Sequence, residues 1–506
     1  MNSLFRRKSL DVLIAQGGDE AHGLKKTLTA IDLIALGIGA IIGAGIFATL
    51  GSATSGGAGL APAGPGVAVS ILLTAVACGF CALCYAEFAS LVPVAGSAYT
   101  YSYATLGELV AWIIGWDLIL EYAVGNIAVA ISWAAYFRQL MAGFGIEIPA
   151  WLCTDLRSTR LAAEVVSSSG IDSLGPEAAV AYQAFQNHPT LLGIPIVCNI
   201  AAVVITALIT WLLVVGVKES ARFNNVIVVL KVLTLFFFIA VGAFHMNNAN
   251  FHPFFPGGFT GVWRGASLIF FAYIGFDAIS TAAEECQQPA RDMPRGIIGS
   301  LIICTLLYIA TALVLCGMIP YSKLIGVADP LAAALSYVEQ GWAAGILAFG
   351  AVVAMTAVLL VFQLGQPRIL MAMSRDGLLG PWFGKIHPVY RTPHVTTILT
   401  GVFVGFFAAV ANIDVIVELT NIGTLFAFIL VCIGILILRH REPERPRKFR
   451  VPFVPFTPLA GIASCLFLMS GLPVMTWIRF ALWLVAGLVI YFTYSRRRSR
   501  VGIEAA

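Results

Sequence analysis

The chain carries little charge for its length. Only 11% of its 506 residues are Asp, Glu, Lys or Arg, and 59% are hydrophobic, whereas soluble domains have about 25% charged and about 45–50% apolar residues. The formal net charge of +4 is too small to suggest a nucleic-acid partner. These proportions exclude an ordinary water-soluble enzyme and indicate a polytopic membrane protein.

Several chemistries lack the residues they need. All seven histidines fall in expected loops or at the edges of apolar runs, so neither a metal site nor a haem is expected at membrane depth. The sequence contains no phosphate-binding loop, which excludes ATP-driven pumping by this chain alone. Cys81 and Cys84 form a C-x-x-C without polar or histidine neighbours, which favours small-residue packing over a redox or metal site. We therefore expect no cofactor, and we find no signal peptide at the N-terminus.

Long apolar runs dominate what is present, and a membrane helix needs about 20 apolar residues. Twelve spans are predicted, which makes the fold all-α and places both termini on one side. The charge pattern orients them, since 23 Lys and Arg fall on the side of the termini and six on the other; the positive-inside rule makes that side cytoplasmic. The predicted spans are 29–56, 66–91, 107–143, 192–216, 223–244, 261–285, 295–319, 341–370, 395–411, 414–438, 455–474 and 476–494.

Two segments outside the spans stand out. Residues 1–28 begin with apolar residues among Arg and Lys and are predicted to form an amphipathic segment on the cytoplasmic leaflet. Residues 145–190 form the only long external segment and are rich in Ser, Glu, Ala and Gln. A small extracellular cap and a mobile loop both fit this composition, and we favour the loop.

The first and sixth spans are interrupted at matching places. The first contains GIGAIIGAGIF over 37–47, and the sixth contains FFAYIGFDA over 270–278. The second interruption lies five spans after the first, an odd number of crossings, so two five-helix units would run in opposite directions. Glycine-interrupted helices at corresponding places in two halves indicate an inverted-repeat transporter with a site at the bilayer midplane. Helix packing alone is the competing interpretation of the Gly39-x-x-x-Gly43 pattern. The predicted repeats are 29–244 and 261–438, followed by two helices and a basic tail in 439–506.

The two interruptions suggest one kind of ligand. Freed N–H groups at a half-helix attract an anion, and freed carbonyls attract a cation; an α-amino acid carries both charges. We expect its carboxylate on the amides of 43–45 and its ammonium on carbonyls of 271–274. The predicted substrate-binding residues, with aromatic packing an equal alternative for Tyr273 and Phe276, are Ile41, Gly43, Ala44, Gly45, Phe271, Ala272, Ile274, Tyr273, Phe276 and Glu121.

Ionisable residues inside apolar runs are costly and therefore usually functional. Lys231 lies in the fifth span and is a candidate for proton coupling, together with Asp277 beside the second interruption. The alternative for Lys231 is an ammonium that reaches the cytoplasmic face along its own side chain. Glu121 shares a helix face with Asp117 and could line the pocket, handle protons or be a hydrogen-bonded structural carboxyl. Glu87 is expected to pair with loop cations in a gate or a fixed scaffold, as are the acids at 284–285.

The chain resembles the amino acid–polyamine–organocation superfamily, and within it the bacterial branch of the cationic amino acid transporter family. The resemblance extends in order from about residue 25 to residue 460. The segments that carry it are GIGAIIGAGIF (37–47), CYAEFASLVPVAGSAYTYSYATLGELVAWIIGWDLILEY (84–122), GVKESARFNN (216–225), FFAYIGFDAISTAAEECQQPARDMPRGI (270–297), MAMSRDGLLGPWFGKIHPVYRTPHV (371–395), LTNIGTLFAF (419–428) and RKFRVPFVPFTP (447–458).

This resemblance implies a leucine-transporter-type fold with a 5+5 inverted repeat and two further helices. It also implies alternating access and uptake coupled to protons rather than sodium, with a fifth-helix lysine that matches Lys231 and a third-helix glutamate that matches Glu121. Some bacterial relatives associate with a small single-span membrane protein. Animal members usually have fourteen spans, and the 145–190 segment is longer than the compact bacterial form.

The leading interpretation is a secondary active permease of the plasma (inner) membrane that imports L-amino acids with protons. An exchanger or facilitator without proton coupling, and an amino acid sensor that binds without transport, are the alternatives. A channel would need rings of charges or carbonyls along a pore, and an enzyme would need a nucleophile–base or metal constellation at depth. Neither pattern is present in the sequence, so we predict that the chain is not an enzyme.

Overall fold

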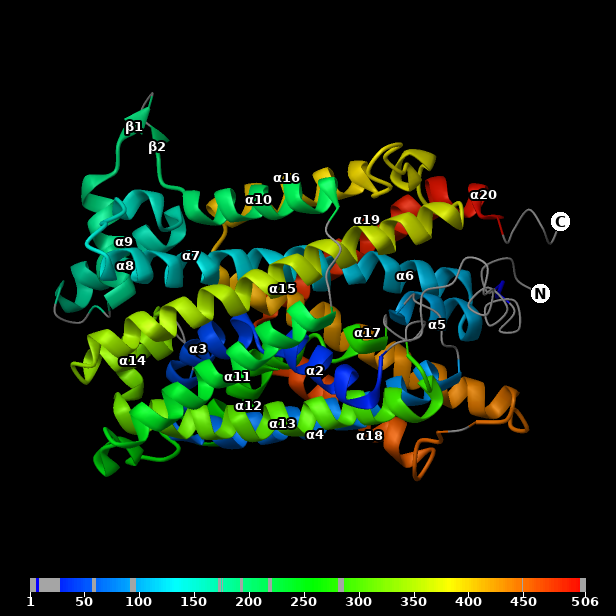
Figure 1. Cartoon of the computed structure of the whole chain (residues 1–506), viewed down its shortest axis with the longest axis horizontal. Helices are drawn as coiled ribbons and strands as arrows, with labels where there is room; N and C mark the ends of the chain where they lie inside the picture. Colours follow the sequence, from blue (N-terminus) through cyan, green and yellow to red (C-terminus); the bar gives the residue numbers. More distant parts are fainter. Residues whose placement is uncertain are drawn as a thin grey trace.

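The structure is a computed structural model that describes residues 6–8, 28–56, 61–91, 97–171, 174, 176–191, 194–216, 221–280, 286–447 and 449–500. Most of its helices run along the long axis of the molecule (Figure 1). The α-helices are α2 (Ala30–Ile41), α3 (Leu50–Ser55), α4 (Val67–Leu91), α5 (Ser97–Thr105), α6 (Glu108–Ile119), α7 (Gly125–Gly143), α8 (Leu156–Ser169), α9 (Pro176–Asn187), α10 (Ile200–Val215), α11 (Ala221–Ala243), α12 (Gly258–Ile269), α13 (Pro289–Met318), α14 (Pro330–Tyr337), α15 (Gly341–Arg375), α16 (His394–Val410), α17 (Ile413–Arg441), α18 (Phe456–Ser470), α19 (Val474–Ile490) and α20 (Arg496–Arg498).

Shorter elements interrupt or join these helices. Three π-helical turns are η2 (Gly45–Thr49), η4 (Leu120–Val124) and η12 (Tyr491–Ser495). The 3₁₀ segments are η3 (Gly64–Gly66), η5 (Ala150–Leu152), η7 (Asn248–Phe251), η8 (Phe270–Tyr273), η10 (Tyr321–Leu324) and η11 (Pro381–Gly384). Strands β1 (Thr190–Leu191) and β2 (Ile194–Pro195) form an antiparallel hairpin.

The helices have the length and composition of membrane spans. Within the described residues, eight are long and apolar enough to cross a bilayer, and α2 with η2 and α3 forms a ninth, bent by 41°. Three more apolar helices, α10, α16 and α18, are shorter. All twelve predicted apolar segments are largely helical where the structure describes them. A multi-pass membrane protein is therefore confirmed.

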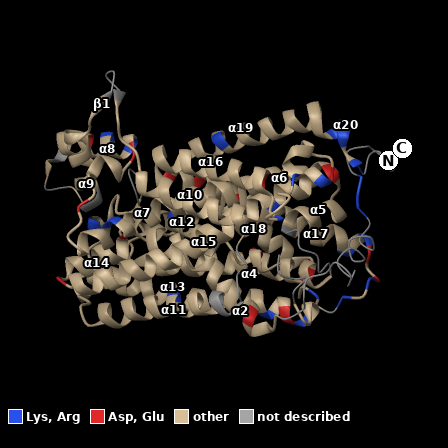
Figure 2. Cartoon of the chain, turned by 45° about the horizontal axis from the view of Figure 1, so that its top comes forward, with Lys and Arg blue, Asp and Glu red and all other residues tan. Residues whose placement is uncertain are grey.

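The surface of the bundle is apolar along its length. Large hydrophobic side chains are exposed there, among them Trp211, Leu306 and Val402, each 65% exposed. Charged residues lie mostly toward the ends of the helices (Figure 2). This is the distribution expected where lipid chains cover the middle of the protein and water covers its ends.

Both predicted interruptions are present. The first span begins with a capping box between Thr29 and Asp32, and its helix α2 ends at Ile41 before the chain turns and resumes as η2. In the sixth span, α12 ends at Ile269 and the tighter 3₁₀ segment η8 follows. Gly275, just after η8, has φ of +114°, a conformation that L side chains rarely adopt. The backbone therefore leaves the helical path at corresponding places in the two spans.

The mobile-loop interpretation of 145–190 is wrong, because this segment folds into a cap. It contains η5, α8 and α9, and the short β-hairpin begins at its last residue; apart from this hairpin the regular elements of the described residues are helical, as predicted. Asp155 caps α8 by accepting hydrogen bonds from the amides of Arg157 and Ser158. The cap is attached to the bundle through Cys198 N–H, which donates to Trp151 O. An Asp before a helix is a typical N-cap residue, so Asp155 indicated the start of α8 in the sequence. The polar composition of the segment suggested a loop instead.

The described parts near the two chain ends meet at Asp376, which follows α15. Lys8 forms an ion pair with the Asp376 carboxylate, and the amide of Arg500 donates to the Asp376 carbonyl. Tyr99 also donates to this carboxylate, at 2.7 Å; burial and the charge of Asp376 raise the pKa of Tyr99, which keeps its hydroxyl a donor. The rest of the predicted amphipathic segment 1–28 lies almost entirely outside the described residues.

Candidate functional site

The two interrupted spans touch each other at their breaks. A Cβ atom added at Gly45 would lie 2.2 Å from Ala272 Cα, and one added at Gly275 would lie 2.8 Å from the carbonyl oxygen of Ala40. Backbone therefore packs directly on backbone, which only glycine allows at such distances. All twelve predicted substrate and coupling residues are buried around this contact. The structure thus brings together the two halves of the predicted site.

One hydroxyl group connects the two breaks. Tyr308, on α13, lies with its hydroxyl oxygen 2.9 Å from Ile41 O and 3.0 Å from Ala272 O. In a regular helix each of these carbonyls would accept from the amide four residues later. The single hydroxyl proton of Tyr308 is therefore shared between two carbonyls that the breaks leave without regular partners. Sequence analysis missed this residue, and its only signal was a polar side chain within an apolar run.

Lys231, on α11, contacts the first break. Its Nζ atom donates to the carbonyl oxygen of Gly39 at 2.6 Å, and the side chain is 1% exposed. The chain turn at Ile42 and Gly43 removes Gly43 N–H from its regular position over that carbonyl. The ammonium occupies this place instead. The alternative in which Lys231 extends to the cytoplasmic face is therefore wrong.

Two more side chains from uninterrupted helices donate to backbone near the breaks. Asn421, on α17, donates to the carbonyls of Ser267 and Leu268 at 2.8 and 3.1 Å, where α12 ends. Tyr136, on α7, donates to Phe47 O at 2.6 Å. Buried carbonyls in a membrane need such partners because no water is at hand. The breaks are thus held open by polar side chains of α7, α11, α13 and α17.

Three acidic side chains are buried beside the second break. Glu121 lies in the π-helical turn η4 and faces Asp277, with Asp117 one turn before it. Oε2 of Glu121 and both carboxyl oxygens of Asp117 and of Asp277 have no hydrogen-bond partner in the described part of the chain. Two carboxylates at close range in a low dielectric repel strongly unless a proton or cation lies between them. Glu121 also interacts with the Thr424 side chain, so a hydrogen-bonded structural carboxyl stays an alternative to pocket lining and proton handling.

The remaining predicted residues divide into backbone and aromatic groups. Phe271, Ala272 and Ile274 lie in or directly after η8, at most 5% exposed. The Tyr273 hydroxyl lies 3.1 Å from Thr305 Oγ1 on α13 and 3.3 Å from Ile71 O on α4, so its side chain packs against these two helices. The Phe276 ring packs against Tyr85 and Phe428 at centroid distances of 5.8 and 5.1 Å. The contacts of Tyr273 and Phe276 are therefore those expected if both aromatic side chains serve in packing.

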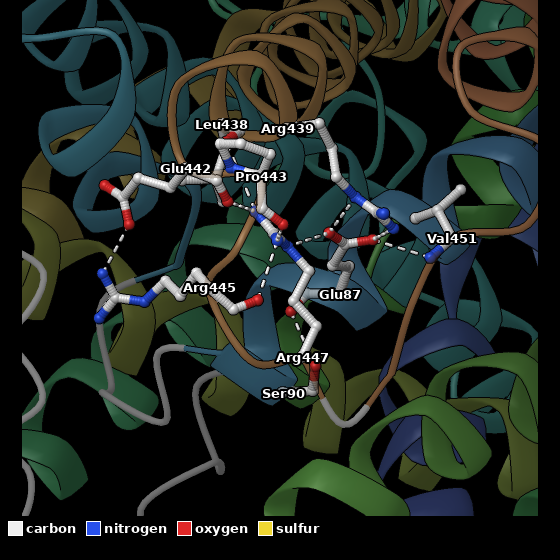
Figure 3. Close-up of polar contacts among 9 residues, drawn as sticks. All are labelled: Glu87, Ser90, Leu438, Arg439, Glu442, Pro443, Arg445, Arg447 and Val451. Carbon is white, nitrogen blue, oxygen red and sulfur yellow. Dashed lines mark hydrogen bonds and ion pairs between the residues drawn. The ribbon is translucent and has the colours of Figure 1, made fainter.

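A second polar cluster lies apart from the breaks, at the end of α4. The buried Glu87 carboxylate accepts from Arg439 Nε and Nη2 at 2.8 and 2.7 Å and from Val451 N–H at 2.7 Å. It also pairs with Arg447 at 3.1 Å. Figure 3 shows these groups converging on one carboxylate. The prediction that Glu87 pairs with loop cations is confirmed, whereas residues 284–285 lie outside the described part of the chain.

Cys81 and Cys84, the two cysteines of the C-x-x-C, do not form a disulfide with each other. Cys81 lies with its sulfur 3.5 Å from that of Cys465 and 3.9 Å from that of Cys432. These thiols belong to α4, α18 and α17, and all three are buried. Small sulfur side chains thus fill the contact between three helices.

Comparison with known proteins agrees with this geometry. Residues 28–496 match the family model described as amino acid permease. The chain is 45% identical to the branched-chain amino acid permease BcaP of Bacillus subtilis and 44% identical to the methylthioribose transporter of the same organism, with 99% of each chain covered in both cases. It is 36% identical to the vacuolar cationic amino acid transporter 4 of Arabidopsis thaliana over 88% of this chain and 68% of that one. The chain therefore belongs to the amino acid permease family of the amino acid–polyamine–organocation superfamily, and it is a membrane transporter, not an enzyme.

Proposed function

We propose that this permease imports L-amino acids together with protons by alternating access. In this proposal the fold is of the leucine-transporter type, with repeats 29–244 and 261–438. Residues 439–506 add two helices and a tail, and 1–28 lie on the cytoplasmic leaflet. Twelve spans result if the nine long or bent spans and the three shorter apolar helices all cross the membrane. Both termini are then in the cytoplasm, and the plasma (inner) membrane is the location.

The substrate backbone binds where the two breaks meet. The α-carboxylate takes the amides of Gly43, Ala44 and Gly45, because freed N–H groups at a helix start favour an anion. The α-ammonium takes the carbonyls of 271, 272 and 274, with Ile41 beside them. A carbonyl oxygen has two lone pairs, so Ala272 can accept from Tyr308 and from a substrate. Small residues at this contact support the proposal, since they let a ligand reach backbone atoms.

The observation that carries proton coupling is the hydrogen bond from Lys231 to Gly39 O. Hydrogen bonds from a charged donor are roughly twice as strong as neutral ones. A charged Lys231 therefore holds α2 against α11 more firmly than a neutral one does. Loss of the proton weakens this contact and lets the first half-helix move. Lys231 thereby couples protonation to the position of α2, without a sodium ion.

The buried acids form the second part of the coupling proposal. Asp277 and Glu121 face each other, and their carboxyl oxygens at this contact have no hydrogen-bond partner among the described residues, so one proton between them relieves their repulsion. Asp277 also lies beside the backbone that binds the substrate ammonium. A cationic substrate group approaching these acids replaces the proton electrostatically. This links occupancy of the site to proton release.

We compare two classes of substrate first, amino acids with branched aliphatic side chains and amino acids with cationic side chains. The rings of Tyr85, Phe276 and Phe428 near the break offer an apolar surface, which suits a branched aliphatic side chain. The acidic pair offers a partner for a cationic side chain. The relatives carry names for both classes, and one is named for methylthioribose. A small single-span protein partner remains a prediction from the resemblance.

Uptake into proteoliposomes tests the function. Labelled leucine, isoleucine, valine, arginine, lysine, alanine and methylthioribose are offered with and without an inward proton gradient. Lys231→Ala and Asp277→Asn are compared with Lys323→Ala, which replaces an exposed lysine in η10. We expect gradient-driven accumulation in the wild type and in Lys323→Ala, and its loss in the other two variants with substrate binding retained.

Other outcomes select the alternatives. Substrate flux that is the same with and without the proton gradient, and the same in Lys231→Ala as in wild type, indicates a facilitator. If this flux also requires substrate on both sides of the membrane, it indicates an exchanger. Binding without flux for every compound indicates a sensor. Either result removes the coupling role proposed for Lys231.

A further inference from the structure

A pocket at the start of α13 has features that the transport mechanism does not use. Its volume is about 510 Å³, within the range of about 300–1,000 Å³ that is usual for small-molecule sites. Arg291 and Arg295 lie at one end, and Ile298, Gly299 and Ile302 line the part farther along the helix. Phe449, from the loop after α17, forms the facing wall. The pocket is thus cationic at one end and apolar at the other.

The two arginines are available to a ligand. Both are exposed, and neither guanidinium has a hydrogen bond or ion pair within the described residues. They are four residues apart on one helix, so their like charges face each other and repel. The acid of the same turn, Asp292, is buried. An anion that binds both guanidiniums would remove this repulsion and satisfy several donors.

The apolar part extends in the direction of the membrane. Ile302 lies seven residues after Arg295, about 10 Å farther along the helix, and is 54% exposed. A helix of 30 residues is about 45 Å long, which exceeds the hydrocarbon thickness of about 30 Å. We therefore place the first two turns of α13, which carry both arginines, at headgroup level and Ile302 among the lipid chains.

The facing wall is held in place. Phe449 lies two residues after Arg447, whose guanidinium is fixed on Glu87 at 3.1 Å. Val451, two residues later, donates its amide to the same carboxylate. The backbone is thus anchored on both sides of Phe449. Because this wall is held in a fixed position, the pocket keeps its shape and can bind one lipid molecule specifically.

We propose that this pocket binds an anionic phospholipid, with the phosphate on Arg291 and Arg295 and an acyl chain along Ile298, Gly299 and Ile302. Basic pockets between helices on the side facing anionic lipid bind such headgroups. The charge at one end and the apolar groove at the other match the two parts of the lipid. A free phosphate would use only the first part. The proposal does not depend on the substrate or on proton coupling.

Native mass spectrometry of the full-length detergent-purified protein tests this site. Phosphatidylglycerol and phosphatidylcholine of matched acyl chains are titrated, and retained lipid is counted. Wild type is expected to retain phosphatidylglycerol preferentially. The double variant Arg291→Gln/Arg295→Gln should bind it roughly 30-fold more weakly, since each interfacial arginine contributes about fivefold. Arg375→Gln, at the exposed end of α15, is the matched control and should retain wild-type affinity.

Two further measurements separate the acyl groove from the charge. Ile302→Trp fills the groove, leaves both arginines in place and should also weaken phosphatidylglycerol binding. Inorganic phosphate and glycerol phosphate should not displace the lipid at equal concentration. Size-exclusion profiles confirm that each variant is folded. Equal retention of both lipids, an equal loss in Arg375→Gln, or displacement by phosphate alone would overturn the proposal.

Discussion

The ammonium of Lys231 donates a hydrogen bond to the carbonyl oxygen of Gly39, 2.6 Å away, between a continuous helix and an interrupted one. The two residues are 192 positions apart in the chain. This contact connects the one lysine placed at depth within the described spans to the backbone that the substrate is proposed to use. It makes the charge of a single side chain a determinant of how α2 packs on α11.

Lys231→Met preserves the length and apolar stem of the side chain but removes its charge and donors. We expect substrate exchange across proteoliposomes to continue and proton-driven accumulation to disappear, because only the protonatable contact with Gly39 is lost. Counterflow and gradient-driven uptake measured on the same vesicles check this. Accumulation equal to wild type would show that the proton acts elsewhere.

Gly45→Ala should prevent correct assembly of the two broken spans. Its Cβ would lie 2.2 Å from Ala272 Cα, so backbone must move. The yield of monodisperse protein in size-exclusion chromatography measures the effect. Gly79→Ala in α4 is the matched control, since a Cβ there meets nothing within 4 Å. That change should be neutral or stabilising by about 0.5–1 kcal/mol, and similar yields for the two variants would contradict the backbone contact.

Tyr308→Phe removes the hydroxyl that links the two breaks. The carbonyls of Ile41 and Ala272 then lose a donor, at a cost of about 1–3 kcal/mol for a buried unsatisfied group. We expect lower thermal stability and a changed KM for uptake, because the same carbonyls adjoin the proposed ammonium site. Tyr337→Phe, at a side chain that is 51% exposed, should behave as wild type. An unchanged melting profile in Tyr308→Phe would argue against this role.

Glu87→Gln leaves two arginine side chains without their shared carboxylate. Breaking a buried ion pair by removing one partner costs about 3–5 kcal/mol, so a clear fall in thermal stability is expected. Glu442→Gln is the control, because that side chain is 41% exposed and forms its ion pair with Arg445. Exposed pairs contribute about 0–1 kcal/mol. Thermal unfolding of both variants in the same detergent decides between a fixed scaffold and a dispensable contact.

Labelling of cysteines tests the predicted orientation. Cys153 and Cys198 are partly exposed on or beside the cap, whereas the other eight cysteines are buried. An impermeant maleimide should label intact cells, and the double variant Cys153→Ser/Cys198→Ser should abolish this. Labelling seen only after cell lysis would reverse the assigned topology.

The residues of the site that stand out from the surrounding apolar sequence could be predicted. Glycine-rich interruptions identified both breaks, and charge in an apolar run singled out Lys231 and Asp277. Tyr308 and Asn421 could not be found in this way, because one polar residue in an apolar helix has many possible partners and only packing selects a carbonyl. The cap was missed for another reason: polar composition concealed α8 and α9, although Asp155 and Pro176 stand at helix starts.

The position of Glu87 has a consequence for the making of the protein. Arg439 follows it by 352 residues, which at about 5–20 residues per second corresponds to roughly 20–70 s of synthesis. During that interval α4 exists while its carboxylate lacks the cations that neutralise it. The ribosome must complete most of the chain before the second span can settle in its final environment. A truncated chain that ends before Arg439 would keep the Glu87 carboxylate without its arginine partners. Quality-control proteases could recognise such a chain by this unpaired acid.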